Sequence, residues 1–133
     1  MKQYQKDIAS LMLRIALGVM FLAHGFTKLL VFTPSGTAQY FQSLGFPWFI
    51  GYLAITFEIG GGLLLLLGIL TRIVSLLAVI QMIVITFIHS VNGWSFSNAG
   101  GGWEYPAFMA LTALSLVFLG SGRFSVLAKY LAY

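Results

Sequence analysis

The stretch TFEIGGGLLLLLGILTR, residues 56–72, places a carboxylate, Glu58, near the start of a run of apolar residues and glycines. The chain has 133 residues, of which 59% are hydrophobic and 8% charged, and its mean hydropathy is +0.95. Soluble domains carry about 25% charged residues, so this composition indicates a membrane protein. Glu58 is one of only three acidic residues, and its position in an apolar run requires an explanation.

Four segments are apolar enough to cross a bilayer, which takes about 20 residues as a helix: Ile8–Phe32, Trp48–Leu70, Ile73–Ser90 and the shorter Tyr105–Gly120. Within lipid the backbone must satisfy its own hydrogen bonds, and long apolar runs do so as helices. Only Thr71 and Arg72 separate the second segment from the third, which predicts a tight antiparallel hairpin. We therefore predict an all-α membrane protein, residues 1–133 forming a single domain with four transmembrane helices in an up-down bundle.

The composition also excludes several classes of function. The net charge is +4, but the basic residues are not clustered as a nucleic-acid partner requires. The absence of cysteine excludes disulfides and thiol redox chemistry within the chain. The apolar run after MKQYQKDIAS is too long for a signal peptide and lacks an A-x-A-like cleavage site. We expect an uncleaved, multi-pass protein whose immediate partner is the lipid bilayer.

The basic residues predict the orientation in the membrane. They gather at the chain start, at the second turn and after the fourth helix, and the members of this group are Lys2, Lys6, Arg14, Arg72, Arg123 and Lys129. Only Lys28 lies toward the other side. The positive-inside rule then places both termini in the cytoplasm. Trp48, Trp94 and Trp103 fall at the opposite edge, where aromatic rings settle among the headgroups.

Two longer connections are expected on the outer side. In the first, GTAQYFQSLGF has a spacing typical of a short helix on the membrane surface, ended by Gly45 and Pro47. The second, SNAGGGWEYP, could enter the mouth of the bundle as a lid. Its three consecutive glycines favour a loose, flexible turn instead.

Helical spacing of 100° per residue assigns an inward face to each span. The predicted inward residues are Arg14, Gly18, Phe21, Gly25 and Lys28; Gly51, Ala54, Glu58, Gly61 and Gly62; Ser75, Ala78, Met82, Thr86 and His89; and Glu104, Ala107, Leu111 and Ser115. Small residues on such a face allow membrane helices to approach closely. Glu58 is therefore expected between helices rather than against lipid.

These faces predict a polar cavity open to the outside. At 1.5 Å per residue, His24 and Glu58 lie at a similar depth, about 12–15 Å from the outer helix ends. The predicted ligand-binding residues are His24, Lys28, Glu58, His89, Trp103 and Glu104. Charged residues inside membranes are costly, usually paired, and often mark a functional site. An ion pair of Glu58 with Arg14 or Lys28 that only fixes the helix register is the competing explanation.

Two of these residues have simpler explanations as well. His89, at a helix end, can simply contact water. Glu104 can complement the positive end of a helix dipole.

The sequence resembles a known protein family. The segments LRIALGVMFLAHGFTKL, FPWF, FEIGGGLLLLLGILTR and GWEYPAFMALTALSLVFLGSGRFSV are similar to those of the DoxX family. The resemblance implies a four-helix protein of the bacterial inner (plasma) membrane. The family takes its name from a subunit of a thiosulfate:quinone oxidoreductase, and other members are associated with quinone and catechol detoxification or with oxidative stress.

Such an activity would make this chain a quinone-handling subunit. The hydrogen bonds to the quinone oxygens and the route for its protons would come from His24, Lys28 and Glu58. The ring would lie between Phe21 and Trp103. No covalent cofactor is expected, and the sequence has neither a dinucleotide fingerprint nor the cysteines of an iron–sulfur site. Electron transfer therefore predicts a soluble or membrane redox partner. With so few helices, a homo-oligomer is also expected.

Four alternatives remain open from the sequence. Haem could be bound by His24 and His89, although their depths differ by a helical turn or more. A metal could be bound by His24, Glu58, His89 and Glu104, but their spacing matches no motif. A small-molecule or proton-coupled transporter would use Glu58 as a protonatable gate. A structural anchor for a redox complex would need no ligand.

Overall fold

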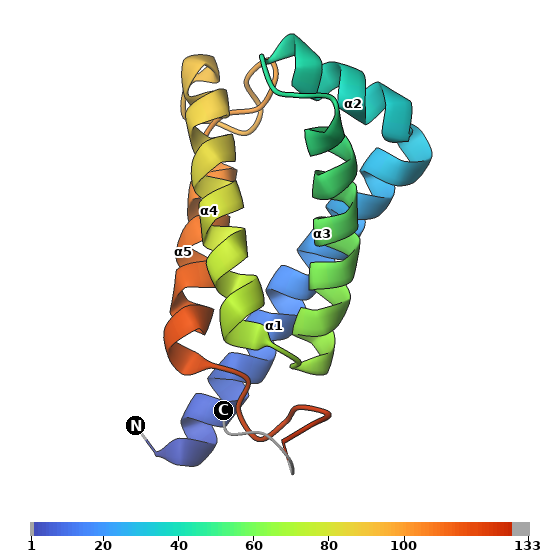
Figure 1. Ribbon diagram of the computed structural model, residues 1–133. Coiled ribbons are helices and arrows are strands. Elements are labelled where there is room, and N and C mark those ends of the chain that lie inside the picture. Colours follow the sequence, from blue (N-terminus) through green and yellow to red (C-terminus); the bar gives the residue numbers. More distant parts are fainter. Residues whose placement is uncertain (1, 129–133) are drawn as a thin grey trace.

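The computed structural model describes residues 2–128 as helices joined by short connections (Figure 1). The elements are α1 (Gln3–Phe26), a π-helical turn (Thr27–Val31), α2 (Pro34–Ser43), α3 (Phe49–Leu67), α4 (Thr71–His89), a 3-10 turn (Ser90–Asn92) and α5 (Glu104–Leu119). Within this range there is no strand, and the all-α prediction is confirmed. Lys129, assigned above to the cytoplasmic side, lies outside the described residues.

Three of the helical segments are long and apolar enough to cross a membrane: Gln3–Val31, Phe49–Leu67 and Thr71–Asn92. The fourth helix, α5, is apolar but has only 16 residues. Large apolar side chains are exposed on the outside of the bundle, among them Leu30, Phe87 and Phe118. Such a surface suits lipid and not water, and the chain is a multi-pass membrane protein.

The hairpin between α3 and α4 forms, but earlier in the chain than predicted. Gly68 ends α3 with a left-handed backbone, φ 75°, and the N–H of Ile69 donates to the Leu64 carbonyl at 2.9 Å. A glycine adopts this conformation at the end of a helix without steric cost. The turn is therefore Gly68–Leu70, and Thr71 and Arg72 already belong to α4.

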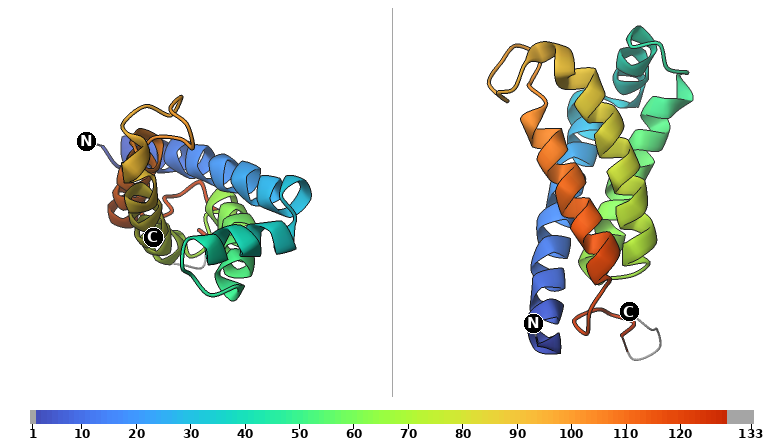
Figure 2. Two further views of the ribbon diagram at one scale, coloured as in Figure 1. Left: turned by 90° about the horizontal axis from the view of Figure 1, so that it is seen from above. Right: turned by 90° about the vertical axis from the view of Figure 1, so that its left-hand side faces the viewer.

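The bundle consists of two closely packed helix pairs. The first pair is α1 with α3, and the second is α4 with α5. Gly18 and Gly62 bring the first pair together, because a Cβ on Gly62 would lie 2.9 Å from the Gly18 carbonyl oxygen. Helices α3 and α4 meet near their turn and separate toward the other end, as Figure 1 and the view from above in Figure 2 show.

The apolar core fills the half of the bundle nearer this turn. Its fully buried members are Leu17, Phe21, Leu65, Val74, Ala78, Met82, Met109, Ala113 and Leu116. The predicted inward face is correct for most of α1, α3 and α4, but that of α5 is wrong. Leu111 is 63% exposed, whereas Pro106, Met109, Ala113 and Leu116 are buried. Because α5 is apolar on all sides, its spacing carried no information about which face packs.

The chain segment after α5, residues 120–128, closes the end of the bundle at which α1 begins (Figure 1). The buried carboxylate of Asp7 accepts a hydrogen bond from Arg123 Nε at 2.7 Å. The hydroxyl of Ser10 donates to the Gly120 carbonyl, and the N–H of Val126 donates to the Leu67 carbonyl at 3.0 Å. These hydrogen bonds tie the two helix pairs together at this end.

At the other end of the bundle α2 lies across the start of α3 (Figure 1). The Thr33 hydroxyl caps the helix by accepting from the N–H of Gly36, and α2 ends before Gly45, whose φ is 93°. A Cβ on Gly51 of α3 would lie 2.8 Å from the Ala38 backbone, so the two helices touch at this glycine. The short helix predicted from the sequence is confirmed, with its start at Pro34, and its position on the membrane surface stays a prediction.

Candidate functional site

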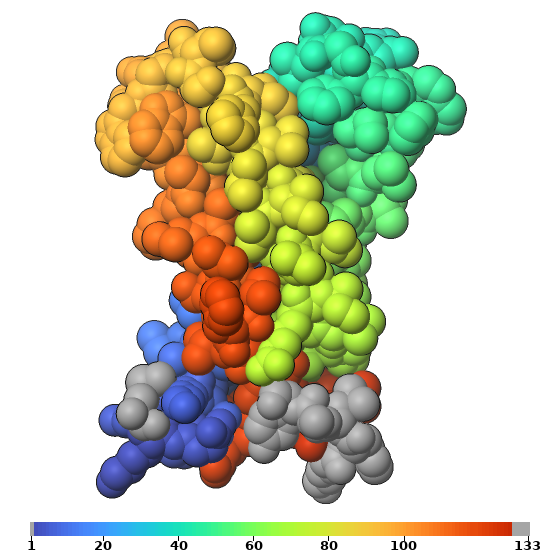
Figure 3. Space-filling model, turned by 60° about the vertical axis from the view of Figure 1, so that its left-hand side comes forward, coloured from blue at the N-terminus to red at the C-terminus, as the bar shows by residue number. Residues whose placement is uncertain are grey.

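A cavity of about 800 Å³ lies between the parted ends of the two helix pairs. Its floor comes from α1 and α3, one wall from α2, and the other from α4, α5 and the connection between them. Figure 3 shows the surface hollowed between α4 and α2 at this end. The lining is mainly apolar, and its ionisable side chains are His24, Lys28, Tyr40, Glu58, His89 and Tyr105. Volume and lining are both those of a small-molecule site.

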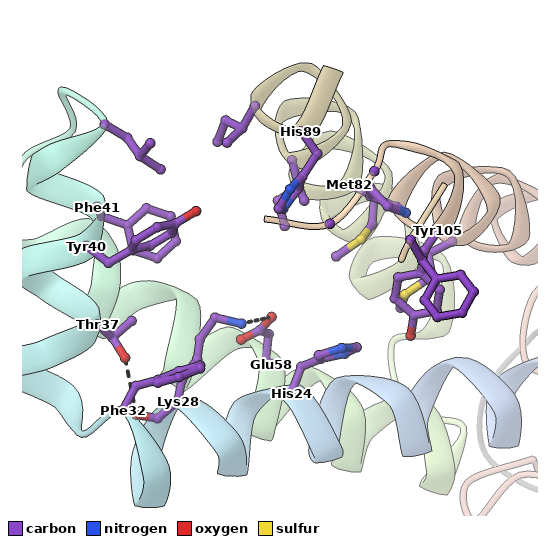
Figure 4. A pocket seen from close by; sticks show the side chains of 18 of the residues that line it. His24, Lys28, Phe32, Thr37, Tyr40, Phe41, Glu58, Met82, His89 and Tyr105 are labelled. Carbon is purple, nitrogen blue, oxygen red and sulfur yellow. Dashed lines mark hydrogen bonds and ion pairs between the residues drawn. The ribbon is translucent and has the colours of Figure 1, made fainter. Parts of the chain in front are cut away.

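The floor of the cavity holds Glu58, the carboxylate near the start of the apolar run in residues 56–72. It is 1% exposed, and its Oε1 accepts from Lys28 Nζ at 3.0 Å (Figure 4). Gln81 of α4 donates its amide to the same oxygen at 3.3 Å. Glu58 therefore links three helices at the level where α3 and α4 begin to part.

Lys28 is aimed at Glu58 by an irregular turn. It belongs to the π-helical turn that continues α1, in which the N–H of Phe32 reaches back to the Thr27 carbonyl at 3.1 Å. The Lys28 carbonyl is itself used, because Thr37 of α2 donates its hydroxyl to it at 3.2 Å. Single π-helical turns inside helices are frequent at functional sites. Here the turn directs the cation inward and anchors α2.

His24 forms the floor beside this pair. Its Nδ1 lies 2.9 Å from the Met20 carbonyl oxygen, and its ring lies 5.7 Å from the Tyr105 ring, centroid to centroid. A carbonyl oxygen only accepts, so Nδ1 carries the proton of this hydrogen bond. In the neutral ring, Nε2 is left as an acceptor.

Three buried polar atoms in the cavity lining have no hydrogen-bond partner among residues 2–128: Glu58 Oε2, His89 Nδ1 and the Tyr105 hydroxyl. Leaving a buried polar atom unpaired costs about 1–3 kcal/mol. Native proteins rarely keep such atoms unless they serve a purpose. These three atoms are therefore free to bond a polar ligand.

The structure brings His24, Lys28, Glu58 and His89 to one cavity, and their role in binding stays a prediction. Trp103 and Glu104 do not line it. Trp103 packs edge-to-face on Trp94 at 4.6 Å, and the Glu104 carboxylate accepts from the N–H of Phe96 at 2.9 Å. Phe21, predicted to flank a ring, is buried in the core against Phe57. These three placements are wrong because depth alone does not give the direction of a side chain.

The predicted ion pair of Arg14 with Glu58 is also wrong. The Arg14 side chain is fully buried at the opposite end of the first helix pair, where it donates to the carbonyls of Leu65, Leu66 and Phe124 at 3.3, 3.4 and 2.6 Å. Two of these carbonyls belong to the last turn of α3, where the helix dipole favours a cation. The register of α1 on α3 keeps Arg14 away from Glu58.

The connection between α4 and α5 is not the loose turn predicted from its glycines. The N–H groups of Trp103 and Glu104 donate to the carbonyls of Gly93 and Trp94 at 3.0 and 3.2 Å. The Asn92 amide donates to the Gly101 carbonyl at 2.9 Å, and Gly101 lines the cavity. Positive φ values at Gly93 and Gly101 let the segment fold back on itself, which is the purpose these glycines serve.

Sequence reasoning missed two polar residues of the site, Gln81 and Tyr105. Gln81 is the uncharged polar residue in the middle of the otherwise apolar stretch LLAVIQMIVI. A polar side chain at that depth usually faces a helix partner, so the signal was present. Tyr105 was taken only as the start of a span, and its contact with His24 depends on how α5 packs against α1.

The metal alternative finds no support, because across residues 2–128 no three histidine and acidic side chains come together as potential ligands.

Comparisons with known proteins agree with this architecture. The family model DoxX matches residues 9–91. The chain is 32% identical over 93% of its length to a Bacillus subtilis protein named "Putative oxidoreductase CatD", of which it covers 87%. It is 31% identical to the inner membrane protein YqjF of Escherichia coli, with 91% of each chain covered. An uncharacterized membrane protein of Mycobacterium tuberculosis is 33% identical over 86% of this chain and 76% of its own. No solved structure matches.

Proposed function

Since this chain belongs to the DoxX family, we propose that it is a membrane subunit that binds a quinone or its reduced hydroquinone form. The observation that carries the proposal is the buried carboxylate of Glu58 on the floor of an apolar cavity. One of its oxygens is paired with Lys28, and the other has no partner among the described residues. A purely structural ion pair would not need this free oxygen or the space above it.

The floor offers hydrogen bonds to both redox forms of such a ring. A quinone has two carbonyl oxygens, which accept, and Lys28 Nζ and the Tyr105 hydroxyl can donate to them. A hydroquinone has two hydroxyls, which donate, and Glu58 Oε2 and the neutral His24 ring can accept. The walls suit a flat apolar ring, since Phe41, Met82 and Met109 line the space above the floor.

Interconversion of the two forms moves two electrons and two protons. The carboxylate of Glu58, placed at the ring oxygens, can take or give one of those protons, and the His24 ring can take or give the other at Nε2. The electrons require a redox partner, such as a flavin- or iron–sulfur-carrying protein, because this sequence contains no dinucleotide fingerprint and no cysteine. The Bacillus subtilis relative bears the name of an oxidoreductase, which supports an assignment to redox chemistry. Assembly with a partner or with further copies of this chain is part of the proposal.

We place both termini in the cytoplasm, so that the cavity opens to the outer side of the inner membrane. Six of the seven basic residues are assigned to one side, and the structure sets the start of α1, the α3–α4 turn and residues 120–128 at one end (Figure 1). A reporter fused after Tyr133 should be active in the cytoplasm. A fusion that is active only in the periplasm would reverse the orientation and make the cavity face the cytosol.

Titration of the purified protein tests the proposed function. We expect saturable binding of duroquinone or durohydroquinone, which are fully substituted and so cannot add covalently to Lys28. Replacing His24 with alanine should weaken that binding about tenfold, since one buried hydrogen bond to the ligand is lost. Thr56→Ala, a change on the exposed face of α3 two residues from Glu58, should leave it unchanged. No saturable binding of either form to the parent protein would refute the function.

A further inference from the structure

The unpaired atoms of the cavity allow the ligand to be specified further, on the premise of the proposed function. We propose that this site binds the reduced, hydroxyl-bearing ring more tightly than the oxidised quinone. The two forms are nearly the same in size and shape, so apolar walls distinguish them poorly. Discrimination must come from hydrogen-bond donors and acceptors at the floor.

Three donors of the site already have an acceptor, whereas the Tyr105 hydroxyl and His89 Nδ1, which donates in one tautomer, have none among the described residues. Lys28 Nζ donates one N–H to Glu58 Oε1 at 3.0 Å, and its side chain is 20% exposed and lines the cavity. The Gln81 amide also donates to Glu58 Oε1. His24 uses its protonated Nδ1 on the Met20 carbonyl. A quinone, which can only accept, would have to share these donors with their present acceptors or rely on the Tyr105 hydroxyl and the His89 ring.

The acceptors of the site are the groups without a partner. Glu58 Oε2 is buried and receives no hydrogen bond from the part of the chain that the structure describes. As a carboxylate oxygen it can only accept. His24 Nε2 is an acceptor in the neutral ring, and the Tyr105 hydroxyl can accept as well as donate. A hydroquinone supplies two O–H donors to this floor, whereas a quinone supplies none and brings its carbonyl oxygens toward the unpaired carboxylate oxygen.

Four compounds that share the tetramethyl ring separate this inference from the proposed function. They are durohydroquinone, duroquinone, and the mono- and di-O-methyl ethers of durohydroquinone, all titrated without oxygen at pH 8 by calorimetry. We expect durohydroquinone to bind about tenfold or more tightly than duroquinone and than the dimethyl ether, the factor typical of a buried acceptor left without a donor. The monomethyl ether, with one hydroxyl, should fall between them.

A variant pair identifies the acceptor. Glu58→Gln replaces one carboxylate oxygen with an N–H donor and should reduce the preference for durohydroquinone over duroquinone. Glu104→Gln makes the same change in charge outside the cavity, where Glu104 contacts Phe96, and should leave the preference intact. If Glu58→Gln does not fold, Tyr105→Phe takes its place. This change removes the Tyr105 hydroxyl but keeps its ring and the Glu58 carboxylate, so the preference for durohydroquinone over duroquinone should persist.

The outcomes are distinct. Duroquinone binding as tightly as durohydroquinone, or the dimethyl ether binding equally well, would overturn the preference while leaving a quinone site in place. A preference for durohydroquinone that survives Glu58→Gln unchanged would also overturn the assignment of the acceptor. Failure of all four compounds to bind would instead remove the proposed function itself.

Discussion

Replacing Arg14 with methionine should lower the free energy of unfolding in detergent by about 3 kcal/mol. The loss is large because the guanidinium donates to three main-chain carbonyls inside the protein, two of them in the last turn of α3. The Leu65 carbonyl keeps a donor in the N–H of Gly68 at 3.2 Å, but the Leu66 and Phe124 carbonyls lose theirs, at about 1–3 kcal/mol each. Part of this is offset because a charged group no longer has to be desolvated. Arg14 also ties α3 to the segment after α5 through Phe124, so its loss loosens the closed end of the bundle.

The matched control is Arg72→Met. Arg72 is exposed and makes one long contact, 3.5 Å, to the Phe118 carbonyl, so this change should alter the unfolding free energy by no more than about 0.5 kcal/mol. Thermal unfolding of both variants in the same detergent gives the comparison. An Arg14→Met protein as stable as Arg72→Met would show that the buried arginine is not what holds the first helix pair to the C-terminal segment.

Replacing Glu58 should have the largest effect on ligand binding. We expect Glu58→Leu to weaken binding of durohydroquinone at least about a hundredfold, because the hydrogen bond to a charged group is lost and Lys28 is left unpaired beside the ring. Glu58→Leu should also lower stability, since a charge without its partner remains part-buried. Calorimetric titration and thermal unfolding measure the two effects on one preparation.

A double variant separates these effects. Lys28→Met with Glu58→Leu removes both charges, and replacing a buried pair with apolar groups is often neutral or stabilising. Stability should therefore return toward the parent value while binding stays weak. If binding returns together with stability, the pair is structural and the cavity binds through other groups. If Glu58→Leu matches the parent in both measurements, the carboxylate serves neither purpose.

The sequence predicted those features that depend on composition and on local spacing. The apolar segments predicted the helices, and the small residues of α1 and α3 predicted their packing faces. The short gap between the apolar segments that end at Leu70 and begin at Ile73 predicted the hairpin. The inward stripe of α1 was correct because glycines and charged residues recur on it in an otherwise apolar helix. In α5 no such contrast exists, and its packing face was missed.

The partner of Glu58 depended on the register between two helices, which spacing within one helix does not give. Gly18 lies against Gly62, and Gly25 lies against Glu58 and Ile59. This antiparallel register sets Lys28 above Glu58 and carries Arg14 to the end of α3. Fourteen residues of helix separate the two cations, about 21 Å at 1.5 Å per residue, so the choice between them was a matter of tertiary packing. The folded connection between α4 and α5 likewise rests on contacts between its two ends, Asn92 with Gly101 and Gly93 with Trp103.

Photo-crosslinking tests the central claim most directly, because it locates the ligand as well as detecting it. An azido-substituted quinone, irradiated with the purified protein and mapped by mass spectrometry, should label residues of the cavity such as Met82, Tyr105 and Met109. Excess durohydroquinone should abolish that label. Labelling confined to lipid-facing side chains such as Phe87 and Phe118, or labelling of the cavity that excess durohydroquinone does not reduce, would contradict a quinone site above Glu58.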